Sequence, residues 1–278
     1  MKNKSLEEHY IEFERDGFTL FPKMLSQEWM NEMKGSFDEL SKKMHVSGQG
    51  DPNVLTNVLE HKHDYVLPAL TNEKLLDFVE MIVGPHVQLE STTFRRTPPQ
   101  QKKENHVLGY HRDMFASFPQ EGVYQRPLLF NALSYLQDLN DENGPLRIIP
   151  GSHKQALSIS PKEMNIAREG DRILYPKAGD IAVFHCSLLH TGCLNLSNEY
   201  RYLYFMTLNH SWLKHRENFD GPVCRDIIKK ARQNNDRRLL RLLGQDDQFV
   251  GRANCGFQSP EEDTWKRWIE EDKGALKT

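Results

Sequence analysis

The apolar positions near the start of the chain are spaced for helices. Ser26 can cap a helix over residues 27–44, because a serine side chain accepts hydrogen bonds from the free N–H groups of a first turn. The apolar side chains of that segment fall on one helical face: Trp29, Met30, Met33, Phe37 and Leu40. Thr71 and Gly84 bracket a second predicted helix over residues 72–83. The chain is therefore expected to begin with a largely helical segment.

Short β-like runs replace the helical spacing between residues 86 and 210. Turn signals such as Asn143-Gly144 and Pro150-Gly151 separate these runs, and glycine supplies the positive φ that tight turns need. The runs are 87–97, 107–113, 128–137, 145–150, 172–175, 181–185 and 202–209, with an earlier one at 18–25. Many short strands at this spacing favour a β-sandwich or jelly roll over alternating strand–helix units.

Helical spacing returns after residue 220. Residues 225–243 carry basic and apolar side chains in alternation, and residues 260–271 begin with a proline and acidic residues, as first turns often do. Polar residues 45–67 show no period and predict a loop, which could lie over a binding site. A single domain over 1–278 is predicted, mainly β with flanking helices: helices in 1–84, a β core at about 86–210 and helices in 220–278.

Composition places the chain among globular proteins and excludes several functions. Hydrophobic residues make up 38% and charged residues 27%, so a packed core is expected. The net charge of −3 argues against nucleic-acid binding, and the basic run at 225–243 is interpreted as a solvated helix face. Four cysteines without a Cys-x-x-Cys pair indicate reduced thiols and a cytoplasmic location. No signal peptide and no apolar run of about 18 residues is found, so no membrane segment is predicted.

The candidate chemistry lies in two segments about eighty residues apart. On a strand, residues two apart face the same side, so His111 and Asp113 can reach one ion. His190 follows a second apolar run and can supply a third ligand. Two histidines and one carboxylate form the facial triad of non-haem iron oxygenases, which leaves three positions open for a bidentate co-substrate and dioxygen. Arg201 lies in an aromatic strand-like run and, if buried, could pair with a dicarboxylate co-substrate.

Other interpretations of these residues remain open at the level of sequence. His111 and Asp113 could be a structural hydrogen-bonded pair, and Arg201 could point outward. His185 could replace His190 as the third ligand. Cys186 and Cys193, together with His190, could instead form a zinc site, although no fourth ligand lies nearby.

Four sequence blocks resemble the phytanoyl-CoA dioxygenase (PhyH) family of Fe(II)/2-oxoglutarate-dependent oxygenases. The resemblance covers residues 86–210. The blocks are His111-x-Asp113; Asn143-Gly144-Pro145-Leu146-Arg147-Ile148-Ile149-Pro150-Gly151-Ser152-His153-Lys154; Gly179-Asp180-Ile181-Ala182-Val183-Phe184-His185; and His190 with Asn195, Ser197 and Arg201. The second block is the most specific, and the order and spacing of all four match the family.

The resemblance implies a double-stranded β-helix, a cupin-like jelly roll with the metal in its mouth. It implies that His111, Asp113 and His190 hold Fe(II) and that 2-oxoglutarate chelates the iron and pairs with Arg201. Dioxygen is the second co-substrate of such enzymes.

Three further positions follow from the same resemblance. Thr97 matches a family position whose side chain often reaches the co-substrate. Asn131 is expected to face inward with Leu133, where the family has a group near the co-substrate. Gly192 stands where the family commonly has serine, which removes a hydroxyl contact from this chain.

The function implied is hydroxylation of an unactivated C–H bond of a small metabolite or natural product, with release of succinate and carbon dioxide. A carboxylate at Asp113 favours hydroxylation, desaturation or ring closure over halogenation, because related halogenases have a small residue there. Two alternatives remain open: a non-catalytic jelly-roll sensor or interaction module, and a zinc or manganese hydrolase or isomerase. A small-molecule substrate is expected, with neither nucleic acid nor membrane as a partner.

Overall fold

The computed structural model describes residues 4–45, 50–100, 107–113, 118–253 and 261–276. The chain forms two compact units, each built from two separate stretches. The first unit comprises Met1–Leu55 and Thr93–Phe205, and the second comprises Thr56–Thr92 and Met206–Thr278. The single domain predicted over 1–278 remains a prediction.

The first unit begins with two helices whose ends are fixed by local sequence. Helix α1 (Leu6–Asp16) begins at a capping box, in which Ser5 and Glu8 exchange side-chain and backbone hydrogen bonds. Gly17 ends it with φ of 83°, and a Cβ there would lie 2.6 Å from a ring nitrogen of His153. Helix α2 (Gln27–Met44) is the helix predicted over 27–44, with Ser26 as its N-cap and the expected apolar face buried.

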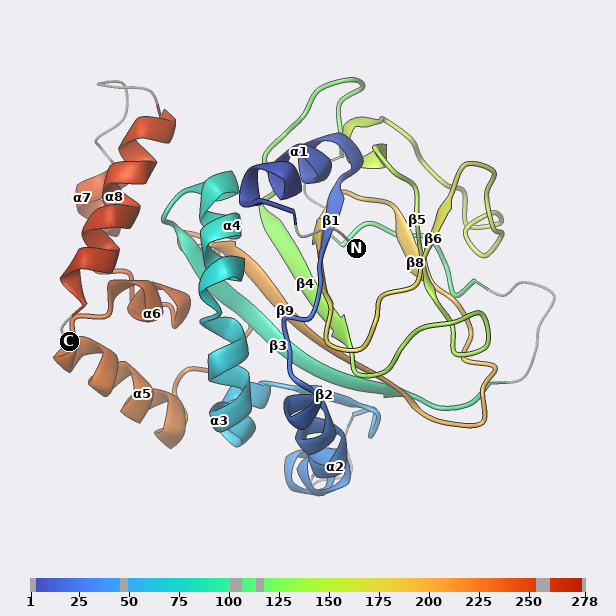
Figure 1. Cartoon of the computed structure of the whole chain (residues 1–278), viewed down its shortest axis with the longest axis horizontal. Helices are drawn as coiled ribbons and strands as arrows, with labels where there is room; N and C mark the ends of the chain where they lie inside the picture. The colour runs from blue at the N-terminus through green and yellow to red at the C-terminus, as the bar shows by residue number, and fades with distance from the viewer. Residues whose placement is uncertain (1–3, 46–49, 101–106, 114–117, 254–260, 277–278) are drawn as a thin grey trace. The chain divides into compact units, whose positions relative to one another are not determined.

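Two antiparallel sheets form the β core (Figure 1). The six-stranded sheet has the order β1 (Phe18–Phe21), β7 (Ile181–His185), β4 (Leu129–Tyr135), β9 (Arg201–His210), β3 (Val87–Thr97) and β2 (Val54–Thr56). The three-stranded sheet has the order β6 (Arg172–Leu174), β5 (Leu146–Ile148) and β8 (His190–Gly192). A short 3-10 helix, η1, covers Ser152–Lys154. This is the double-stranded β-helix expected from the sequence.

The two sheets share one apolar core in the first unit. Leu133 of β4, Ala182 of β7 and Ile148 of β5 are buried in the same cluster. Because alternate residues of a strand face the same side, Asn131 and Phe184 point toward this interior as well. One end of the shared interior carries the polar residues described below.

Most predicted strands are present, and one is replaced by isolated bridges. The runs at 87–97 and 181–185 match β3 and β7 along their whole length. The run at 107–113 pairs only at Val107 and His111, each with one residue of the segment that contains β8. The run predicted over 18–25 is shorter in the structure, because β1 ends at Phe21 and residues 22–25 form a loop.

The second unit is helical apart from its parts of β3 and β9. Its helices are α3 (Val58–Leu70), α4 (Glu73–Val83), α5 (Pro222–Gln233), α6 (Arg237–Leu242), α7 (Phe249–Ala253) and α8 (Glu261–Ala275). The prediction of a loop over 45–67 is wrong in part, since β2 and most of α3 lie there. Asn72 caps α4 in place of the predicted Thr71, because its side-chain oxygen accepts from the N–H of Leu75.

Much of the basic run at 225–243 pairs with carboxylates of the second unit. Arg238 contacts Asp77 at 2.8 Å, and the fully buried Arg241 contacts Asp272 at 2.6 Å. The prediction of a solvated helix face therefore fits only part of the run. Within the described residues, no helix combines the length and apolar character needed to cross a bilayer.

Candidate metal centre

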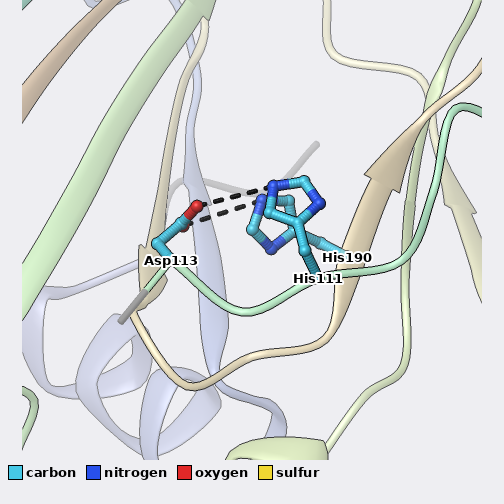
Figure 2. A group of neighbouring side chains, drawn as sticks. All are labelled: His111, Asp113 and His190. Atoms are coloured by element: carbon cyan, nitrogen blue, oxygen red, sulfur yellow. Dashed lines mark ion pairs between the residues drawn. The ribbon is translucent and has the colours of Figure 1, made fainter. Parts of the chain in front are cut away.

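Three side chains from two segments that are far apart in sequence lie close together in the first unit (Figure 2). His111 and His190 are antiparallel bridge partners, joined by backbone hydrogen bonds of 3.0 and 3.1 Å. Their ring centroids are therefore only 4.4 Å apart. The two oxygens of Asp113 lie 3.6 Å from Nε2 of His111 and of His190 respectively. Within the described residues, no other group of three or more His, Cys, Asp or Glu side chains is close enough to hold a metal ion.

Backbone carbonyls set the orientation of both imidazoles. Nδ1 of His111 lies 2.9 Å from the carbonyl oxygen of Gly109, and Nδ1 of His190 lies 3.0 Å from that of Leu188. A carbonyl only accepts, so each Nδ1 must donate, and each neutral ring keeps its Nε2 lone pair free. Burial lowers the pKa of His190, which favours the neutral ring that a metal requires. In its neutral form, each ring therefore directs the lone pair of Nε2 toward Asp113.

Asp113 is held by its backbone and by its side chain. Its N–H donates to the carbonyl of Cys186 at 2.9 Å. Its Oδ2 accepts a hydrogen bond of 2.6 Å from Nδ2 of Asn131, on β4. The inward direction expected for Asn131 is confirmed, and the structure places its amide beside Asp113. The expected contact between Asn131 and a co-substrate remains a prediction.

The alternative ligands suggested by the sequence are engaged elsewhere. Nδ1 of His185 accepts from the N–H of Ser187 at 3.0 Å, so its Nε2 carries the proton and donates to the carbonyl of Gln125 at 2.8 Å. Burial lowers the pKa of His185 to about 3. Cys186 and Cys193 do not join His190 in a metal-binding group among the described residues. Neither the His185 ligand set nor the zinc set is present.

Arg201 is a buried cation at the start of β9. Its side chain points inward, and the residue is only 5% exposed. Nη1 donates to the carbonyls of Gly144 and Cys193, the latter at 2.9 Å, while Nη2 lies 3.4 Å from Oγ1 of Thr97. No carboxylate in the described part of the chain forms an ion pair with it, and burial lowers the pKa of Arg201. A buried guanidinium without an acidic partner is costly, so Arg201 is chemically suited to bind an anion.

Two glycines shape the space around this guanidinium. A Cβ at Gly144 would lie 2.2 Å from Nη1 of Arg201, so glycine is required there for more than its φ of 81°. The sequence suggested only a turn for Gly144. At Gly192 a Cβ would be 3.5 Å from Leu108 and 3.9 Å from Nη2 of Arg201, which leaves room for a larger residue.

Two further basic residues, Arg112 and His153, make structural contacts with backbone carbonyls. Arg112 lies between two of the candidate ligands in sequence, and its side chain contacts the segment 152–157. Its Nη2 donates to the carbonyls of Ser152 and Leu157 at 3.0 and 3.1 Å, and burial lowers the pKa of Arg112 to about 10. His153 lies with Nε2 at 3.0 Å from the carbonyl oxygen of Glu14.

A double-stranded β-helix that brings two histidines and one aspartate together is typical of the class of non-haem Fe(II) oxygenases. The chain belongs to the phytanoyl-CoA dioxygenase (PhyH) family, whose sequence model matches residues 13–202. The resemblance drawn from the four sequence blocks is thereby confirmed. The protein is a 2-oxoglutarate-dependent dioxygenase of that family, with Fe(II) and 2-oxoglutarate as its cofactors.

The sequence relatives are an ectoine dioxygenase and an L-proline hydroxylase. The chain is 24% identical over 229 residues to an ectoine dioxygenase of Bordetella bronchiseptica, which spans 71% of this chain and 73% of the relative. It is 24% identical over 230 residues to an L-proline trans-4-hydroxylase of Streptomyces griseoviridis, across 72% of this chain and 84% of that enzyme.

Solved structures share the fold at lower identity. HygX from Streptomyces hygroscopicus, with nickel and 2-oxoglutarate bound, superposes with a TM-score of 0.60 at 16% identity, over 77% of this chain and 90% of HygX. The epimerase SnoN of nogalamycin biosynthesis gives 0.55 at 18% identity, over 74% of this chain and 81% of SnoN. Hydroxylases and epimerases therefore both occur among the proteins that this chain resembles.

Proposed function

We propose that the protein hydroxylates an unactivated C–H bond of a small metabolite or natural product and converts 2-oxoglutarate to succinate and carbon dioxide. In this proposal His111, Asp113 and His190 hold Fe(II). Arg201 pairs with the distal carboxylate of 2-oxoglutarate, and Thr97 borders the same carboxylate. The observation that carries the proposal is the meeting of the three ligand atoms within 4.8 Å of one another, which is the spacing that a single ion can bridge.

The residues of the chain provide binding and orientation. Iron with 2-oxoglutarate supplies the oxidising chemistry when both are bound, as in other cofactor enzymes. The carbonyls of Gly109 and Leu188 fix the two imidazoles, and Asn131 fixes the carboxylate of Asp113. Such outer contacts keep a metal site in one geometry.

Arg201 supplies a fixed positive charge at a place that is already dehydrated, so an incoming carboxylate finds its partner preoriented. Because Nη1 is occupied by backbone carbonyls, Nε, Nη2 and Thr97 are the groups left to meet that anion. We infer from this arrangement that the guanidinium selects a co-substrate with a second carboxylate.

A small substrate suits the surroundings of the ligands. Leu108 is 41% exposed close to the site, and the segment that carries it is backed by Asn165, whose Nδ2 donates to the Leu108 carbonyl at 2.9 Å. Tyr110 N–H bonds the carbonyl of Met164 at 2.8 Å, which ties the same two segments together. We propose that this edge contacts substrate. The sequence relatives named for ectoine and L-proline support a small polar molecule.

A cytoplasmic location is part of the proposal. The three cysteines in the described residues are free and buried: Cys186, Cys193 and Cys224. Buried thiols without disulfides are usual in a reducing compartment.

The test is a substrate screen that measures 2-oxoglutarate-dependent oxygen uptake and succinate release. A productive substrate should raise both together, and Asp113→Ala should abolish them because one metal ligand is lost. Asp138→Ala is a matched control, since Asp138 is an exposed acid that pairs with Lys177. Normal turnover by Asp113→Ala would reject the ligand assignment.

The same screen separates the competing functions. If the protein bound iron and 2-oxoglutarate but released no succinate with any substrate, a sensor role would be favoured. A protein that turned over substrate with zinc or manganese and without 2-oxoglutarate would be a hydrolase or isomerase.

A further inference from the structure

One cross-strand pair supports two of the three candidate metal ligands. Asn131 of β4 and Phe184 of β7 are Cα partners in the antiparallel register, so their side chains lie on the same inward face. The ring of Phe184 packs against His190, with centroids 4.7 Å apart. The amide of Asn131 donates to Asp113 at 2.6 Å. The six-stranded sheet thus orients ligands that themselves lie outside it.

The amide makes the two oxygens of Asp113 different. Measured from the imidazoles they are equivalent, since Oδ1 and Oδ2 each lie 3.6 Å from one Nε2. Only Oδ2 accepts from Asn131, and this bond engages one of its lone pairs. Asn131 is itself buried, so water competes little for the contact.

The difference matters because a carboxylate can bind a metal through one oxygen or through two. With one oxygen, the three ligands fill three of the six positions of an octahedral ion. With two oxygens they fill four, and a bidentate 2-oxoglutarate would then take the last two. A contact that limits Asp113 to binding through one oxygen therefore determines whether the site keeps an open position once iron and 2-oxoglutarate are bound.

We propose that Asn131 is a positioning residue that keeps Asp113 a one-oxygen ligand by holding Oδ2, which leaves Oδ1 for the metal. This inference rests on the proposed function of the site. It assigns Asn131 to the carboxylate ligand in place of the co-substrate contact expected from the sequence. The two assignments differ in what they predict for 2-oxoglutarate affinity.

The test compares Asn131→Leu with the unaltered protein under anaerobic Fe(II). Leucine keeps the branching of asparagine at Cγ, with a larger side chain, and removes the donor. Two quantities are measured: the visible absorbance that appears when 2-oxoglutarate binds Fe(II), and the electron paramagnetic resonance signal of added nitric oxide, a probe for an open position. Gln137→Leu is the control, because it removes comparable hydrogen bonds between a side-chain amide and the backbone of Tyr202, away from the ligands.

We expect the affinity of Asn131→Leu for 2-oxoglutarate to stay within a few-fold of that of the unaltered protein. Its affinity for nitric oxide should fall about tenfold or more, which is the usual effect of replacing a residue that orients a metal ligand. Asn131→Ala, which removes the donor and adds no charge, should also lose the nitric oxide signal. Gln137→Leu should keep it.

An unchanged nitric oxide affinity in Asn131→Leu would overturn the inference, and so would a loss of 2-oxoglutarate affinity alone, which would restore the co-substrate role. If Asn131→Leu did not fold, Asn131→Ala would give the same readout. If the unaltered protein showed no 2-oxoglutarate absorbance, the proposed function itself would be rejected, so the two failures are distinguishable.

Discussion

Replacing Arg201 with alanine should weaken 2-oxoglutarate binding and leave the metal ligands in place. Nη1 is occupied by the carbonyls of Gly144 and Cys193, whereas Nη2 has only the long contact of 3.4 Å to Thr97 and Nε has no partner in the described part of the chain. One edge of the guanidinium is therefore committed to the protein. The remaining edge can give a carboxylate one or two charge-assisted hydrogen bonds.

The size of the effect follows from that geometry. Hydrogen bonds to charged groups contribute about 1.5–3 kcal/mol, and truncating one partner of a buried charge pair costs about 2–5 kcal/mol. With one edge available, we expect a loss of about 2–4 kcal/mol, or a Kd for 2-oxoglutarate raised roughly 30- to 700-fold. The carbonyls of Gly144 and Cys193 lose their donor as well, so the variant should also melt at a lower temperature.

The assay is an anaerobic titration of the Fe(II) protein with 2-oxoglutarate, followed by visible absorbance, with thermal melting to confirm folding. Arg96→Gln is the matched control, because Arg96 lies next to Thr97 on β3 but pairs with Asp38. Thr97→Val should show a smaller rise in Kd than Arg201→Ala. A folded Arg201→Ala protein whose Kd stayed within about threefold of normal would show that another group anchors the co-substrate.

Two further substitutions test other parts of the structure. Gly192→Ser should lower the KM for 2-oxoglutarate severalfold in steady-state assays. A Cβ at this position would be 3.9 Å from Nη2 of Arg201, so the serine hydroxyl can reach the carboxylate that Arg201 binds. A raised KM would mean that another group needs the space. Burial raises the pKa of Glu217 from 4.5 to about 7, so stability present below pH 4.5 is lost as pH rises through 7. Glu217→Gln should flatten the fall in melting temperature between pH 5 and 8, whereas parallel melting curves would contradict this.

Helices with local signals were predictable, and helices fixed from a distance were not. Ser26 caps α2 with its own side chain, so the sequence shows where that helix begins. The N-cap of α3 is Asn57, whose side chain makes no cap bond and whose φ is 58°. The first N–H of α3 donates instead to Thr92, which in turn contacts Glu217. Residues far along the chain therefore fix where α3 begins, and the sequence of the helix itself carries no signal for it.

The candidate site shows the same division. The two-residue spacing of His111 and Asp113 requires only local geometry, and the structure places both side chains together with His190. The contact between Asn131 and Asp113 depends on which residue of β4 stands opposite Phe184. Register of this kind is fixed by packing across the sheet. The role of Gly144 depends likewise on where Arg201 reaches from another strand.

The two candidate histidine ligands differ sharply in accessibility. The side chain of His111 is 53% exposed, whereas that of His190 is 8% exposed. An arriving ion would meet His111 first and exchange its last water molecules deeper in the protein, and a chelator would attack from the same side. Access from solvent on the His111 side leaves a bound ion open to exchange, so the occupancy of the enzyme should follow the supply of ferrous ion around it.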